Sequence, residues 1–201
     1  NVGNAKNVTI IYTLSGADAA NYSMADKTIT ANITKKALTA ASTAANKTYN
    51  GNTTATITLG TVTGLVTGDT VTITPAGTFA DKNVGNAKNV TIIYTLTGTD
   101  AGNYSMANKT VTANITQKAL TANSTAANKV FNGSAAATVT KGTLSGAVSG
   151  DDIDFTAAGT FADKNVGTGK TVTIKYTLSG TDAANYSMAD KTVTANITAK
   201  D

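Results

Sequence analysis

The sequence lacks five residue types altogether, namely cysteine, histidine, tryptophan, glutamate and arginine. General acid–base catalysis usually relies on histidine or on a glutamate of shifted pKa, and cysteine is the usual thiol nucleophile, so most catalytic chemistry is excluded. Zinc sites built from cysteine or histidine are excluded for the same reason. We therefore expect neither enzyme activity nor a bound cofactor.

Charged side chains are also scarce, at 14% of residues with a net charge of +4. The positive charges are lysines scattered along the chain, whereas a phosphate backbone is bound by concentrated lysine and arginine, often beside stacking aromatics. Aromatic residues make up only 5% of the sequence. No apolar run approaches the roughly 20 residues that a membrane helix needs. We expect no nucleic-acid partner and no membrane contact from this segment.

What the sequence does contain is a repeat of fixed period. Residues 1–14 recur letter for letter at residues 83–96, and a close variant follows at residues 165–178. Both steps are 82 residues (83 − 1 and 165 − 83). Near-identical tandem copies are typical of extended scaffolds, because an active site needs different residues that converge at one place. A serine, lysine or aspartate mechanism is open in principle, but it would have to arise within these copies.

The register of the repeats divides the chain into three parts. Residues 1–35 correspond to the C-terminal part of a truncated repeat, and residues 36–117 and 118–201 are full repeats. Because the sequence begins without an initiator Met or a signal peptide, we expect it to be cut from a longer chain. No glycine-, proline- or serine-rich linker separates the full repeats at Gln117 and Lys118. We therefore expect neighbouring repeats to pack closely into a stiff rod.

Within a repeat, apolar residues alternate with threonine, asparagine and lysine at a period of two. Val90, Ile92 and Tyr94 share one face of such a segment, and this alternation predicts a half-buried strand. Glycine and asparagine interrupt the short segments, as they do in turns between strands. Many short strands in so small a unit predict an all-β fold of tandem immunoglobulin-like antiparallel β-sandwich repeats. Repeats of β-grasp-like fold are the alternative.

One turn recurs in all three copies of the repeat. Its segment from Gly98 to Met106 has an aspartate four residues before a tyrosine, which resembles the tyrosine corner of immunoglobulin domains. A tyrosine that merely caps the edge of the core beside a turn would have an equally structural role. The predicted structural residues of this turn are Asp18 and Tyr22, Asp100 and Tyr104, and Asp182 and Tyr186.

A second motif places an aromatic residue before an Asn-Gly pair, which is preferred in tight type I′ hairpins. Its residues are Tyr49, Asn50 and Gly51 in the first full repeat and Phe131, Asn132 and Gly133 in the second. With the Gly-Asp segment at residues 64–69 and the Asp-Ala-x-Asn-Tyr turn that follows, this order resembles the YDG/MBG-type repeats of large bacterial surface adhesins, including filamentous-haemagglutinin-like exoproteins. Asn replaces Asp in both copies and Phe replaces Tyr in the second, which fits a turn and a packing role. The resemblance implies a cell-surface or secreted stalk and no chemistry.

The densest acidic cluster consists of Asp151, Asp152 and Asp154. Carboxylates at such short spacing could bind calcium, which prefers oxygen ligands. The equivalent residues of the preceding repeat are Asp69, Thr70 and Thr72. Because a site that vanishes in the neighbouring copy is better explained as a solvated loop, we expect no bound metal.

These features predict a structural stalk segment of an extracellular bacterial adhesin or biofilm-matrix fibre, which projects a distal binding region and tethers cells. Its partners would be the neighbouring repeats of the same long chain and other copies of the protein in a fibre, at the bacterial cell surface or in the secreted matrix. A subunit of a self-assembling extracellular filament is the alternative, because residues 1–35 expose a strand without the strands that would cover it. A carbohydrate- or ice-binding repeat surface is third, and the shortage of exposed aromatics disfavours it.

Overall fold

The computed structural model describes residues 1–201, which form β-strands and three single-turn 3-10 helices. None of these helices combines the length and apolarity needed to cross a bilayer. The strands assemble into tandem sandwich-like repeats, so the predicted all-β fold of β-sandwich repeats is confirmed.

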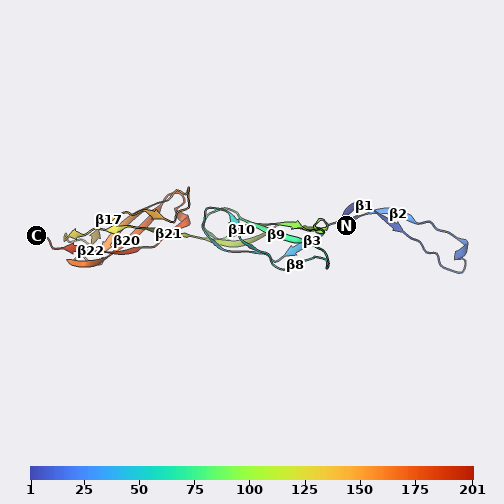
Figure 1. Ribbon diagram of the computed structural model, residues 1–201, viewed down its shortest axis with the longest axis horizontal. Coiled ribbons are helices and arrows are strands. Elements are labelled where there is room, and N and C mark those ends of the chain that lie inside the picture. The colour runs from blue at the N-terminus through green and yellow to red at the C-terminus, as the bar shows by residue number, and fades with distance from the viewer. The chain divides into compact units, whose positions relative to one another are not determined.

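The strands follow the sequence repeat (Figure 1). Residues 1–35 contain β1 (Gly3–Ile10), η1 (Ala19–Asn21) and β2 (Lys27–Ile33). The first full repeat contains β3 (Lys36–Ala40), β4 (Thr43–Ala44), β5 (Lys47–Thr48), β6 (Thr54–Ala55), β7 (Ile57–Thr58), β8 (Val62–Thr63), β9 (Thr72–Phe79), β10 (Gly85–Thr97), η2 (Ala101–Asn103), β11 (Tyr104–Met106) and β12 (Lys109–Thr116). The second contains β13 (Lys118–Ala122), β14 (Thr125–Ala126), β15 (Lys129–Val130), β16 (Ala136–Ala137), β17 (Val139–Thr140), β18 (Leu144–Ser145), β19 (Asp154–Phe161), β20 (Gly167–Ser179), η3 (Ala183–Asn185), β21 (Tyr186–Met188) and β22 (Lys191–Thr198).

The chain divides into two compact units whose boundary does not follow the sequence repeat. The first unit comprises residues 1–43, 56–77 and 91–111, and the second comprises residues 44–55, 78–90 and 112–201. Strands β9, β10 and β12 contribute residues to both units. The second unit therefore holds the whole second full repeat together with the part of the first repeat that contacts it.

The second full repeat is built on a five-stranded sheet of order β15-β22-β20-β19-β16. Its two longest pairs, β19 with β20 and β20 with β22, are antiparallel. A three-stranded sheet of order β18-β13-β21 and the pair β14-β17 complete the repeat. The first full repeat has the same orders, β5-β12-β10-β9-β6, β11-β3-β8 and β4-β7.

The sheets are mixed, which differs in detail from the antiparallel sheets that the sequence predicts. Strand β13 runs parallel to β21, with Lys118 opposite Tyr186, and β15 runs parallel to β22. Parallel partners cannot be joined by a tight hairpin, so these pairs connect segments that are far apart in the sequence. The alternation of side chains could not reveal them, because its period is two for either strand direction.

The core of the second unit lies between the five-stranded sheet and the pair β14-β17. Its buried cluster consists of Phe161, Val172, Ile174, Ala195 and Ile197, and half-buried Ala126 and Val139 pack against it. Each of the larger side chains, the valines, isoleucines and phenylalanine, contributes about 1.5–3 kcal/mol when it is fully removed from water. The burial alternates along β20, with Val172 and Ile174 both fully buried, as the sequence pattern predicts.

A β-bulge interrupts β1 and β20 at equivalent positions, between Gly3 and Lys6 and between Gly167 and Lys170. The residues in left-handed conformation there and at the equivalent point of β10 are Ala5 and Ala87, both with φ 48°, and Gly169 with φ 61°. An asparagine on the neighbouring strand accepts a hydrogen bond from each of their amides, at 2.7–2.8 Å. Alanine carries steric strain in this conformation that glycine avoids.

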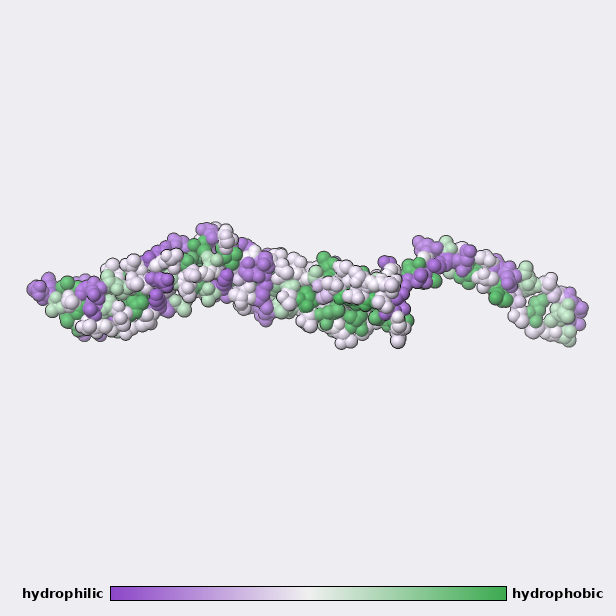
Figure 2. Space-filling model, viewed as in Figure 1, coloured by the Kyte–Doolittle hydropathy of each residue, from purple (hydrophilic) through white to green (hydrophobic).

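Residues 1–35 form only the hairpin β1-β2, which lacks the other strands of a full repeat. Its apolar side chains stay exposed, including Tyr22 at 73% and Met24 at 53%. Figure 2 shows hydrophobic surface on this hairpin. A hairpin by itself cannot bury an apolar face, because that requires packing against a second layer.

Candidate functional site: the joint between the full repeats

The joint between the two full repeats begins with an asparagine clasp. Asn185 lies at the end of η3, and only 4% of its surface is exposed. Its Oδ1 accepts a hydrogen bond from the Val84 amide at 2.9 Å, and its Nδ2 lies 3.2 Å from Asn83 Oδ1. One buried side chain of the second repeat thus holds the backbone of the first.

The same clasp occurs once more, inside the first compact unit. Asn103 lies at the end of η2, where its Oδ1 accepts from the Val2 amide at 3.0 Å and its Nδ2 lies 3.3 Å from Asn1 Oδ1. Each of these contacts is displaced by 82 residues from its counterpart (83 − 1 and 185 − 103). The clasp is therefore a property of the repeat.

A carboxylate of the second repeat forms the centre of the joint. The side chain of Asp151 is only 5% exposed. Its Oδ2 accepts hydrogen bonds from the hydroxyls of Tyr186 at 2.6 Å and Tyr49 at 2.7 Å, and its Oδ1 accepts from Lys82 Nζ at 3.2 Å. Tyr186 belongs to the same repeat as Asp151, whereas Tyr49 and Lys82 belong to the preceding one. This carboxylate therefore links the two repeats through charge-assisted hydrogen bonds, which are stronger than neutral ones.

The protonation equilibria of this cluster follow from its geometry. Burial alone would raise the pKa of Asp151, but the hydrogen bonds from Tyr186, Tyr49 and Lys82 together lower it below the ordinary 3.8. Burial and the hydrogen bond to Asp151 raise the pKa of Tyr186 to about 12. The Tyr49 hydroxyl and the Asp151 carboxylate raise the pKa of Lys82. At neutral pH the cluster thus holds one carboxylate, one ammonium group and two neutral phenols.

Apolar contacts surround the polar centre. The rings of Tyr49 and Tyr186 meet edge to face with their centroids 5.4 Å apart. Gly51, with φ 79°, lies directly against Val148, and a Cβ added to Gly51 would be only 2.8 Å from Val148 Cγ1. The glycine is needed here both for the left-handed turn and for the close approach of the next repeat.

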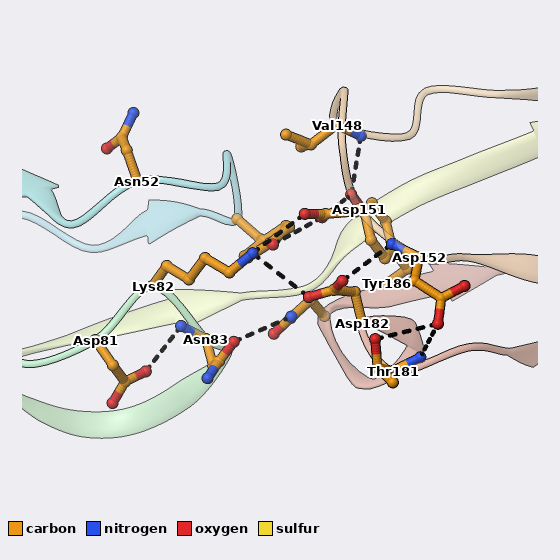
Figure 3. Close-up of polar contacts among 12 residues, drawn as sticks. Asn52, Asp81, Lys82, Asn83, Val148, Asp151, Asp152, Thr181, Asp182 and Tyr186 are labelled. Carbon is orange, nitrogen blue, oxygen red and sulfur yellow. Dashed lines mark hydrogen bonds and ion pairs between the residues drawn. The ribbon is translucent and has the colours of Figure 1, made fainter.

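The neighbouring acidic groups make further contacts, and one of them, Asp182, shares Lys82 with Asp151 (Figure 3). Asp182 Oδ1 lies 3.4 Å from Lys82 Nζ, and its Oδ2 accepts from the Asp152 amide at 3.0 Å. Asp152 Oδ2 accepts from Thr181, while Asp154 pairs with Lys141 at 2.5 Å. No three acidic side chains come together in a group that could hold a metal ion. The structure thus disperses the three carboxylates that the sequence offered as a calcium candidate.

The residues of the two sequence motifs occupy defined places. Tyr104 donates to Asp69 and accepts from the Val66 amide at 3.2 Å, and Asp100 accepts from the Thr70 amide at 2.8 Å. The corner thus fastens the adjoining loop of its own repeat. Asn50 and Asn132 each accept a backbone amide two residues later, Gly133 has φ 75°, and Phe131 is half-buried. Asp18 lies at the start of η1, and Tyr22 is exposed.

The sequence did not reveal that three residues, Lys82, Asp151 and Asn185, hold the joint together. Lys82 was one scattered lysine among many, and Asp151 was considered only as a calcium candidate. Asn185 lies within the recurring Asp-Ala-x-Asn-Tyr turn, directly before the tyrosine. Its presence in every copy was the available signal, since a turn that needs only an aspartate and a tyrosine gives no reason for a fixed asparagine.

The fold and the joint together define a protein of tandem β-sandwich repeats that contact one another directly. Residues 34–113 and 116–195 match the YDG domain, and these two matches cover well over half of the chain. The protein therefore belongs to the YDG domain family. No curated protein matches the sequence.

Proposed function

We propose that this chain is a load-bearing spacer, a stalk segment of an extracellular bacterial adhesin or biofilm-matrix fibre without enzyme activity of its own. Such a segment would hold a distal binding region away from the cell surface or tether one cell to another. Its partners would be neighbouring repeats and other copies in a fibre, with no role for nucleic acid or membrane.

The observation that carries this proposal is the joint at Asp151. A buried carboxylate receives donors from both repeats, while Asn185 clasps the backbone of the preceding repeat. Domains that only need to be connected are usually joined by flexible polar linkers with few contacts across them. Repeats that contact their neighbours directly instead limit bending, which suits a spacer that must transmit force.

Bending at the joint can be measured with a pair of spin labels. The chain has no native cysteine, so Thr78→Cys and Thr160→Cys place labels at exposed, equivalent positions of the two full repeats, both within the second compact unit. Electron–electron dipolar spectroscopy should give one narrow distance distribution. The additional change Asp151→Asn should broaden it, and Asp154→Asn, which removes a carboxylate that pairs with Lys141 within its own repeat, should not. A broad distribution in the starting protein would contradict a spacer role.

Location needs a separate test. Antibodies against the purified chain should label intact, unpermeabilised cells that produce the protein, or the matrix around them, and brief treatment with protease should remove the signal. Labelling that appears only after permeabilisation would exclude an extracellular stalk even if the joint is stiff.

A further inference from the structure

The end of the second full repeat carries the surface that the first full repeat uses in the joint. We define this end face by five residues, each 82 positions after a residue of the joint. They are Phe131, Gly133, Lys164, Asn165 and Val166, the equivalents of Tyr49, Gly51, Lys82, Asn83 and Val84. Four of the five pairs are identical residues, and only the aromatic position differs.

The exposure of these pairs shows what a docked repeat covers. Tyr49 is 1% exposed, whereas Phe131 is only half-buried. Val84 is half-buried under the Asn185 clasp, whereas Val166 is 54% exposed. A Cβ added to Gly51 would meet Val148, but one added to Gly133 has nothing within 4 Å. The end face is thus the equivalent surface without a repeat docked on it.

A hollow in the end face matches this difference. It has a volume of ≈ 560 Å³ and is lined by Val130, Phe131, Asn132, Gly133 and Lys200. In the joint, the equivalent place beside Gly51 is filled by the Val148 side chain of the following repeat. Lys164, the equivalent of Lys82, carries the positive charge that Lys82 directs at Asp151 in the joint.

We infer that the end face docks a further YDG unit, one that presents a free counterpart of Asp151 together with a free Asn-Tyr pair like Asn185 and Tyr186. This inference deepens the proposed spacer function and rests on it for its biological meaning. The asparagine would clasp the Val166 amide, and the aspartate would pair with Lys164. Because Phe131 has no hydroxyl, this carboxylate would receive one hydrogen bond fewer than Asp151 does. The joint at the end face would therefore be weaker than the joint between the two full repeats.

A second copy of this chain offers the end face only part of this set, because its hairpin presents an exposed Asn21-Tyr22 pair with no counterpart of Asp151 in residues 1–35. Asp151 and Asn185 are already held by Tyr49, Lys82 and Val84 of their own chain, and Asn103 is held by Val2. A YDG unit whose acidic loop and Asn-Tyr pair are unoccupied is therefore the partner that the surface fits.

The test uses a lengthened chain in which a second copy of residues 118–199 follows Ala199. In the original chain the Val166 amide should exchange with solvent freely, and in the lengthened chain its exchange should slow at least about tenfold, towards that of the Val84 amide. Unchanged exchange at Val166, with the added copy shown to be folded, would overturn the inference.

Two controls keep the interpretation unambiguous. Replacing the added copy's counterpart of Asn185 with alanine should restore fast exchange at Val166 while the copy stays folded. Protection of Val166 that grows with the concentration of the original chain would mean that a second copy is the occupant, and would overturn the assignment. The spin-label experiment probes the joint between the two full repeats, and neither it nor the cell-labelling experiment uses an added copy. Failure of the exchange test therefore leaves the proposed function standing, and failure of the other two leaves the docking inference standing.

Discussion

The hairpin of residues 1–35 and the two full repeats share a turn of nearly the same sequence but differ in what surrounds it. The turn folds alike in all three places, as η1, η2 and η3. Its tyrosine, however, is 73% exposed as Tyr22 and only 3% and 2% exposed as Tyr104 and Tyr186. The turn is therefore encoded locally, whereas the burial of its tyrosine is not.

The strands that follow the turn explain the difference. In the full repeats Tyr104 and Tyr186 begin β11 and β21, which pair in parallel with β3 and β13. No strand begins at Tyr22, because residues 1–35 contain no counterpart of β3 or β13 for it to pair with. A strand that is defined by a distant partner disappears when that partner is absent, while a 3-10 turn closed by its own hydrogen bonds persists.

The largest effect is expected from removing this tyrosine in the two settings. Tyr186→Ala leaves a cavity and removes one of the three donors to Asp151, so we expect a loss of about 3–5 kcal/mol in the free energy of unfolding. Tyr22→Ala should change the free energy of unfolding by less than about 0.5 kcal/mol, because truncating an exposed side chain removes few contacts. Urea titration followed by circular dichroism measures both. Equal losses would show that the hairpin turn is packed in solution after all.

The next comparison is between Asp151 and Asp69, the aspartates that accept hydrogen bonds from Tyr186 and Tyr104. Asp151→Asn weakens three charge-assisted hydrogen bonds, so we expect a loss of about 1–3 kcal/mol. The matched change Asp69→Asn affects a carboxylate that Tyr104 contacts without a Tyr49 or Lys82 counterpart, and should be milder. A larger loss for Asp69→Asn than for Asp151→Asn would mean that the contacts across the joint add nothing to the stability that Asp151 provides.

The same carboxylate predicts a dependence on pH. Because the pKa of Asp151 is lowered in the folded protein, its contribution is present above the ordinary value of 3.8 and disappears as the pH falls through the lowered value. The difference in unfolding free energy between the parent and Asp151→Asn should therefore be constant near neutral pH and shrink below about pH 4. If this difference stayed the same at every pH down to acid unfolding, the folded protein would not favour the ionised form of Asp151.

A pair of glycines separates turn strain from packing in the joint. Gly51→Ala and Gly133→Ala both place alanine at positive φ and share that strain. Only Gly51→Ala also drives a methyl group into Val148, so it should lose about 1–3 kcal/mol more. Thermal unfolding of the two variants side by side gives the difference. Identical losses would place Val148 farther from the turn in solution.

The aromatic position of the motif offers a smaller test. Tyr49→Phe removes one donor from Asp151 and should lose about 1–2 kcal/mol while leaving the packing of the ring intact. The reverse change, Phe131→Tyr, adds a hydroxyl to an end face with no acceptor opposite and should be neutral. Destabilisation by Phe131→Tyr would indicate that this ring is more deeply packed than its half-buried position suggests.

The smallest effect concerns the bulge. Ala87→Gly relieves left-handed strain of roughly 1–2 kcal/mol and adds unfolded-state entropy worth about 0.5–1 kcal/mol, so the net result is a gain near 0.5 kcal/mol. Ala5→Gly, in the hairpin, should leave the unfolding of the full repeats unchanged. The second full repeat already has Gly169 at this point. A loss in Ala87→Gly would mean that the entropy added to the unfolded chain outweighs the strain relieved, since glycine keeps the amide that Asn114 accepts.

Much of the fold could be predicted from the sequence, because period-two alternation identifies strand faces directly. Val90 and Ile92 were assigned to one buried face, and both are fully buried. The parallel pairs could not be predicted, since a short segment such as β15 carries no sign of the direction in which its distant partner runs.

The joint was harder to predict than the fold, because it depends on residues 102 positions apart, such as Tyr49 and Asp151. Tyr49 belongs to a motif that the sequence predicts to be structural, but its partner could not be named from an Asn-Gly turn signal alone. The acidic run drew attention to Asp151 for its metal-binding potential. What decided its role was burial beside two tyrosines and a lysine, which only the assembled repeats provide.

The asparagine clasp has a consequence for how a gene for such a protein can change. Asn185 recognises a main-chain amide and a side chain that every copy carries at the same point, and Asn103 does so identically. The clasp can therefore form between any copy and any other without a compensating substitution in its own residues. Gain or loss of whole repeats would therefore lengthen or shorten the protein in steps of 82 residues and keep the clasp at every junction.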